Sequence, residues 1–224
     1  MKTRHLLIGI ALTLAPTASA LAAAPMPHRM VEMPTKESRA AFADAMRNLW
    51  EQHVFWTRLY VVSALAGLPD KDATANRLLQ NQEDLGDAIK PYFGIVAGDK
   101  LHALLKEHIL IAVAIIDAAK AKESAALTGA KARWYANADE IAAFLSAADP
   151  KGCPPEHTKT MMREHLDLTL SAVTARLEAR YADEVAAFDK IEAAALMMAD
   201  MLSAGIIKKM PSKFAKSTIV RSHP

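Results

Sequence analysis

The chain has 224 residues, of which 52% are apolar and only 8 are glycine. This composition suits one globular domain with a sizeable core and favours helices over strands. The formal net charge of +2 gives no support to nucleic-acid binding, and the single cysteine excludes an internal disulfide.

Residues 1–24 have the pattern of an export signal peptide. Lys2 and Arg4 form a basic start, residues 6–14 form an apolar run, and small residues at 18–20 or 22–24 suit cleavage. The apolar run is too short to span a bilayer, and no later segment is long and uncharged enough, so no transmembrane segment is predicted. The mature protein is therefore expected to be periplasmic or secreted.

Loss of the signal peptide changes the charge balance. The 27 lysines and arginines lose Lys2 and Arg4, which leaves 25 basic residues against 25 acidic ones. Five of these basic residues lie in the basic tail, residues 208–224, which has no acidic residue. The tail is a candidate for contact with an anionic surface, although a solvated end is the commoner role of such a segment.

Apolar residues at intervals of three and four predict helices through most of the chain. Residues 25–34 contain three prolines and are expected to form an extended leader, and Thr35 is the expected N-cap of the first helix. Pro91 and Gly94 are expected to end the second helix. The predicted helices span residues 36–66, 72–90, 98–120, 125–148, 156–180 and 183–207.

These helices pair through short turns, and loops of about six to ten residues join the pairs. The sequence thus predicts an all-α fold: an up-and-down six-helix bundle over residues 35–207, built from three αα-hairpins. A four-helix core with a peripheral hairpin is the alternative.

Internal repetition supports three hairpins. Segments 49–53 (LWEQH), 104–108 (LLKEH) and 161–165 (MMREH) are alike, and their histidines lie 55 and 57 residues apart. Segments 77–84 (RLLQNQED) and 133–140 (RWYANADE) match at a spacing of 56 residues. A repeat of this length indicates one supersecondary unit used three times. The third copy has drifted, with Ala194 in place of the repeated asparagine.

Each repeated histidine lies in an apolar stripe near the middle of its helix, as do Asn81 and Asn137 on the returning helices. A buried imidazole or amide needs a partner, so His53 is expected to pair with Asn81 and His108 with Asn137. On one interpretation these pairs are purely structural and align the helices.

The other interpretation is a metal site. If the three histidine-bearing helices form an inner trio, His53, His108 and His165 converge on one ion, for which Zn or Cu is the natural choice. Asn81 and Asn137 would then orient the imidazoles. Methionines near the third hairpin add soft sulfur that suits Cu(I): Met161, Met162, Met197, Met198 and Met201.

A polar cavity for a small molecule is a further interpretation. It requires Asp84 and Glu140 to face inward beside the histidines, with Arg58 as a partner and Trp56 as a wall. Surface placement is the commoner position for such charged residues. A module that binds a protein partner, in which the histidine–asparagine pairs are purely structural, also fits this sequence.

Motifs of common enzyme classes are missing from the chain. It has no His-Glu-x-x-His, no phosphate-binding glycine loop, no nucleophile elbow and no Cys-x-x-Cys-His for covalent haem. The sequence therefore favours a protein that acts by binding over one that acts by catalysis.

Several of these segments together resemble a known family. Residues 49–58, 81–84, 106–109, 134–140 and 198–202 are similar to a family of exported bacterial helical-bundle proteins for which no activity is established. The resemblance covers nearly all of the mature chain. Members of that family carry histidine at the positions of Glu192 and Ala194. Because this chain lacks those two histidines, the resemblance gives less support to a site in its third hairpin.

Overall fold

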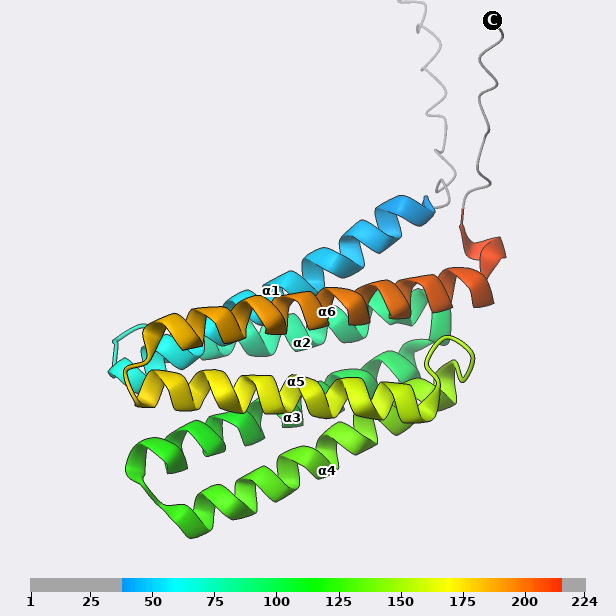
Figure 1. Ribbon diagram of the computed structural model, residues 1–224. Helices are drawn as coiled ribbons and strands as arrows, with labels where there is room; N and C mark the ends of the chain where they lie inside the picture. The colour runs from blue at the N-terminus through cyan, green and yellow to red at the C-terminus, as the bar shows by residue number, and fades with distance from the viewer. Residues whose placement is uncertain (1–37, 215–224) are drawn as a thin grey trace, which may run out of the picture. The chain divides into compact units, whose positions relative to one another are not determined.

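The computed structural model describes residues 38–214, and these residues form an all-α bundle of six helices without strands (Figure 1). None of the described helices carries an apolar stretch long enough to cross a membrane. The expected signal peptide, the leader and residues 215–224 of the basic tail lie outside the described residues. The elements are α1 (Arg39–Ala66), α2 (Lys71–Phe93), α3 (Ile95–Ala121), α4 (Ser124–Ala148), α5 (Pro155–Leu177), α6 (Tyr181–Lys209) and a short 3-10 turn, η1 (Pro211–Lys213).

The six helices pack in a closed ring. Each helix contacts its neighbours in the chain, and α6 packs against α1 to complete the ring. Weaker contacts cross the ring from α1 to α3 and from α1 to α5. Every hairpin therefore has neighbours on both sides, which favours the six-helix bundle over the alternative with a peripheral hairpin.

The ends of α1 are held by local hydrogen bonds. Ser38 is the N-cap, and its side chain accepts a hydrogen bond from the backbone N–H of Ala41 at 3.0 Å. The cap predicted from the sequence, Thr35, lies outside the described residues. Gly67 ends the helix with φ of 68°, a left-handed conformation that glycine adopts without strain.

The connection between α2 and α3 is shorter than predicted. We expected α2 to stop at Pro91, but it continues to Phe93, and Gly94 alone separates it from α3. Pro91 is tolerated because it lies in the last turn, where its missing N–H removes one hydrogen bond from a helix that is about to end. Gly94 has φ of 89°, which other residues rarely adopt, so this tight turn depends on glycine.

A pair of glycines lets α2 and α3 approach closely. A Cβ atom on Gly86 would lie 2.7 Å from the carbonyl oxygen of Gly98 and 2.8 Å from the Cβ atom of His102. A Cβ atom on Gly98 would likewise lie 2.7 Å from the carbonyl oxygen of Gly86. These contacts involve rigid atoms, so the two backbones touch at this crossing only because both residues lack a side chain.

Two apolar clusters fill the bundle. The larger spans all six helices and includes Phe214, which follows η1 and packs on Phe42 and Tyr92 with ring centroids 5.3 and 5.4 Å apart. The smaller lies mostly on the C-terminal side of the repeated histidines and includes Tyr60, Ile116 and Val173. A layer of buried polar side chains lies where the two clusters meet.

Replacing Gly86 with alanine should destabilise the bundle by roughly 1–3 kcal/mol, because the new methyl group overlaps backbone atoms of α3. Urea unfolding would measure the change. Gly129→Ala on α4 is the matched control, since its Cβ atom would meet only the Arg133 guanidinium, at 3.8 Å. That control should be neutral or up to about 1 kcal/mol stabilising. Equal stability of the two variants would contradict the close crossing of α2 and α3.

Candidate functional site

The structure brings the three repeated histidines together. His53 on α1, His108 on α3 and His165 on α5 are only 5%, 3% and 7% exposed. The ring centroid of His165 lies 5.9 Å from that of His53 and 6.2 Å from that of His108. We call these three residues the histidine layer. Up-and-down topology explains the convergence, because α1, α3 and α5 run parallel and carry the histidine near mid-helix.

His108 has the partner that the repeat predicts. Its Nδ1 lies 2.9 Å from Oδ1 of Asn137, and the amide nitrogen of Asn137 donates to the carbonyl of Leu104 at 3.1 Å. That second bond fixes which end of the amide faces the histidine. Nδ1–H of His108 therefore donates to Asn137, and Nε2 keeps its lone pair.

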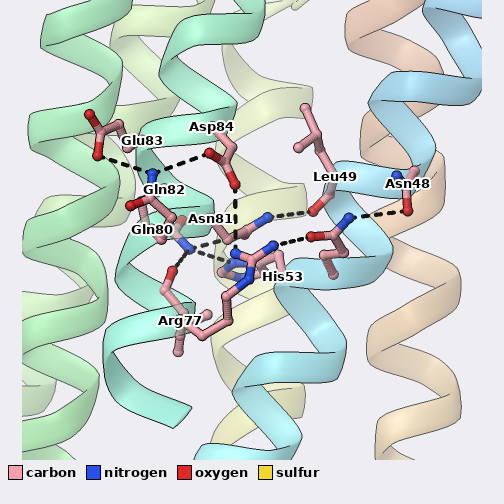
Figure 2. A network of polar contacts seen from close by, with 11 residues as sticks. Asn48, Leu49, His53, Arg77, Gln80, Asn81, Gln82, Glu83 and Asp84 are labelled. Atoms are coloured by element: carbon pink, nitrogen blue, oxygen red, sulfur yellow. Dashed lines mark hydrogen bonds and ion pairs between the residues drawn. The ribbon is translucent and has the colours of Figure 1, made fainter. Parts of the chain in front are cut away.

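His53 has a different partner from the one expected. Asn81 donates to the carbonyl of Leu49 at 3.0 Å, as Asn137 does to Leu104, but its oxygen does not reach the imidazole. The amide nitrogen of Gln82 takes that place, 3.3 Å from Nδ1 of His53 (Figure 2). The predicted His53–Asn81 pair is thus wrong, because the longer glutamine side chain lies between the two groups.

The orientation of Gln82 determines the tautomer of His53. Its amide nitrogen has two hydrogens for three neighbouring acceptors, the carbonyl of Leu78 at 2.8 Å, Oδ1 of Asn81 at 3.2 Å and Nδ1 of His53 at 3.3 Å. An amide nitrogen offers no acceptor to an Nδ1–H group, so the hydrogen of His53 is placed on Nε2. Sequence reasoning passed over Gln82, although it lies four residues after Leu78 and three before Leu85, the spacing of the apolar stripe.

His165 is the member of the layer without a hydrogen-bonding partner for its ring among residues 38–214. Thr169 donates to its backbone carbonyl at 2.8 Å and leaves the imidazole untouched. The repeat has Ala194 where the other hairpins have asparagine. Instead of an amide, the ring of His165 faces the rings of His53 and His108.

Burial keeps all three imidazoles neutral. Burial, together with a smaller effect of the neighbouring histidines, lowers the pKa of His53 and of His108 to about 3. Burial also lowers the pKa of His165 to about 4. At neutral pH each ring is uncharged and carries one lone pair, which is the form that binds a metal ion.

Two small cavities adjoin the histidine layer. One, of about 10 Å³, is lined by all three histidines and by Trp50, Gln82, Leu85, Leu105, Met162 and Met198. The other, of about 30 Å³, is lined by the histidines and by residues that include Thr57, Tyr60 and Thr169. Cavities of these sizes accommodate an ion or one or two water molecules, whereas organic ligands occupy several hundred Å³.

Residues that line the two cavities include three with a buried polar atom that lacks a hydrogen-bond partner within the described part of the chain. Nε1 of Trp50 and Oε1 of Gln82 belong to residues of the smaller cavity, and Oγ1 of Thr57 belongs to a residue of the larger one. Most buried polar atoms in folded proteins are paired, so each such exception calls for an explanation. The smaller cavity has both a donor and an acceptor of this kind on its lining residues, and it is the candidate site.

The other candidate residues lie away from the histidine layer. Asp84 is half-exposed and pairs with Arg77 at 3.6 Å, and the guanidinium of Arg77 lies over the ring of Trp56 at 5.4 Å. Glu140 is exposed. Arg58 lies over the ring of Phe188 at 5.2 Å, between α1 and α6. The structure therefore does not assemble the polar small-molecule cavity that these side chains would have formed.

The methionines divide into two groups. Met162 and Met198 are buried and line the smaller cavity, whereas Met161, Met197 and Met201 are not part of its lining. Met197 is 61% exposed. Of the five methionines near the third hairpin, only these two line the smaller cavity.

The spacing of the histidines is wider than that of a loaded site. With metal–nitrogen bonds of about 2.0–2.1 Å, the ring centroids of three histidine ligands lie about 5.2–5.5 Å apart. Accordingly, no three His, Cys, Asp or Glu residues within residues 38–214 form a ready metal-binding group. Closing the histidine layer onto one ion therefore requires the rings to move toward one another.

Comparison of this chain with protein-family models, with curated proteins and with solved structures gave no match.

The pKa values predict acid sensitivity of the metal-free fold. Unfolded histidine titrates near 6.5, so between about pH 6.5 and pH 4 the unfolded chain binds more protons than the folded one. As the pH is lowered through this range, the free energy of unfolding should therefore decrease, by at most about 1.4 kcal/mol per pH unit for each histidine. Urea unfolding at pH 7, 6 and 5 with a chelator present would measure the slope.

The variant His165→Leu should reduce that slope by up to the contribution of one histidine. The control His157→Leu, which removes an exposed histidine of the same helix, should remove much less of it. An equal slope in wild type and His165→Leu would show that His165 is not held neutral in the folded protein.

The His108–Asn137 pair can be tested with a double-mutant cycle. Asn137→Leu leaves Nδ1–H of His108 buried without its acceptor and should cost about 1–3 kcal/mol. His108→Leu should have a similar cost, because it orphans the oxygen of Asn137. The double variant should be more stable than the sum of the two changes predicts, by about 0.5–3 kcal/mol. Strictly additive changes would contradict the hydrogen bond.

Proposed function

We propose that this protein binds one transition-metal ion between His53, His108 and His165. The observation that carries the proposal is the position of His165, a buried neutral imidazole that faces two others and has no hydrogen-bond partner in the described chain. The bound ion would occupy the cavity of about 10 Å³ that all three rings line.

A purely structural layer would need a buried water molecule in one of the two cavities to satisfy the ring of His165. An unsatisfied buried polar group costs about 1–3 kcal/mol, and leucine at the same position would avoid that cost. The cavity beside it leaves Trp50 and Gln82 with unpaired polar atoms as well. Breaches of local packing rules in natural proteins concentrate at functional sites, where a ligand supplies the missing interaction.

The surroundings of His108 suit a metal ligand. Asn137 accepts the Nδ1 hydrogen, which leaves the lone pair on Nε2 and holds the ring in one orientation. Such partners of ligand histidines typically change metal affinity by 10–100-fold. His165 has neither nitrogen committed, so it binds an ion through either tautomer.

His53 must change tautomer before it binds the same ion. At present its Nδ1 accepts from Gln82. A turn of the Gln82 amide would present Oε1, which now has no partner, to Nδ1–H of His53, at the cost of the hydrogen bonds that the amide nitrogen now donates to Leu78 and Asn81. Nε2 would then carry the lone pair, and the unsatisfied oxygen would gain its hydrogen bond.

The export signal that the sequence predicts over residues 1–24 supports a periplasmic or secreted location for this binding activity. With neutral ligands and no catalytic motif in the sequence, the proposed role is binding of the ion and not turnover of a substrate.

The proposal is tested on mature protein purified without an affinity tag. Wild type should contain, or take up, one equivalent of Cu, Zn, Ni or Fe and gain thermal stability from it. His165→Leu should lose this binding, yet its metal-free form should be about 1–3 kcal/mol more stable because an unpaired polar group is gone. His157→Leu, on the exposed face of α5, should bind as wild type does.

Two results would refute the proposal. The first is a wild-type protein that neither contains nor takes up any of these metals. The second is a His165→Leu variant that binds metal with wild-type stoichiometry and affinity.

A further inference from the structure

Resting on the proposed function, we infer that the ion is Cu(I) and that the thioethers of Met162 and Met198 complete its coordination. The sulfur atoms come from α5 and α6, the hairpin whose returning helix lacks the repeated asparagine. The third repeat would thereby supply sulfur where the other two supply amides.

The two methionines are positioned for this role. Met162 precedes His165 by three residues, so both side chains lie on the same face of α5. Met198 is on α6, and both methionines are buried against the cavity that the histidine layer lines. Thioether sulfur is a soft ligand that selects Cu(I) over harder ions.

The charge of the site favours a monovalent ion independently of the sulfur atoms. The residues that line the cavity are the three histidines, Trp50, Gln82, Leu85, Leu105 and the two methionines, and none of them is acidic. The free energy of transferring an ion into a low-dielectric interior rises with the square of its charge. A divalent ion would face a cost about four times as large without any carboxylate to offset it.

The two cavities beside the histidine layer also differ in chemistry. The residues that line the larger one include Thr57, Tyr60 and Thr169 and no methionine or cysteine. Only the smaller one combines imidazole nitrogen with thioether sulfur. The ion is therefore assigned to the side of the histidine layer that faces Trp50.

The test compares affinities for two metals under anaerobic conditions. Cu(I) is titrated in competition with a chromogenic Cu(I) chelator, and Zn(II) in competition with a zinc indicator. Met162→Leu/Met198→Leu should weaken Cu(I) binding at least tenfold and change Zn(II) binding less than twofold. Leucine has nearly the volume of methionine, so the variant should fold, and thermal unfolding of the metal-free protein checks this.

Met197→Leu is the matched control, because Met197 neighbours Met198 in sequence but is exposed. It should bind both metals as wild type does. X-ray absorption of the Cu(I)-loaded wild-type protein gives a reading that needs no variant. Sulfur scatterers at about 2.3 Å are expected beside nitrogen.

The outcomes separate this inference from the proposed function. Cu(I) affinity that is unchanged in the double variant, wild-type absorption data without sulfur, or tighter binding of Zn(II) than of Cu(I) would overturn the assignment of Cu(I) and leave the histidine site standing. A wild-type protein that binds neither ion would overturn the proposed function itself.

Discussion

The burial of three imidazoles at mid-height of the bundle is the constraint on which the rest of the structure depends. A neutral imidazole removed from water must regain its hydrogen bonds from other side chains or from a ligand. In the first two hairpins this requirement restricts how far the returning helix is displaced along its partner, since an amide must lie at the level of the histidine. Asn137 meets it for His108, and Gln82 meets it for His53.

The three hairpins differ in how they provide a hydrogen-bond partner for the buried histidine, and the proposed function depends on these differences. Asn137 presents an oxygen to its histidine, whereas Gln82 presents a nitrogen, so His108 and His53 are opposite tautomers. The third hairpin offers no amide at all. Three identical histidine–amide pairs would give every histidine a hydrogen-bond partner. In this bundle the ring of His165 has no such partner in the described chain, and it lies beside a cavity the size of one ion.

Packing elsewhere in the bundle restricts what the histidine layer can bind. The Gly86–Gly98 contact brings the backbones of α2 and α3 together near the level of Leu85 and Leu105, two residues that line the smaller cavity. Apolar side chains enclose the layer from both sides, so the space that remains suits an ion or water. The same apolar enclosure keeps carboxylates at a distance: Asp84 is half-exposed, Glu140 is exposed, and neither lines the smaller cavity.

The sequence by itself determined which residues are helical and which of them face the core, because helix periodicity is a local property that a single chain segment carries. The three buried histidines, the His108–Asn137 pair and the six-helix bundle follow from that pattern. Contacts between helices are not local, and they required the tertiary structure.

Gln82 displaces Asn81 as the partner of His53 because the reach of a side chain across two helices depends on their separation, which no stripe of residues encodes. The same holds for the two methionines that line the cavity, out of five candidates near the third hairpin. It also holds for Pro91, which the end of α2 accommodates because α3 begins after a single glycine. The tertiary structure alone decided that His165 meets two other imidazoles in place of an amide, since that arrangement arises only when three separate hairpins close into one ring.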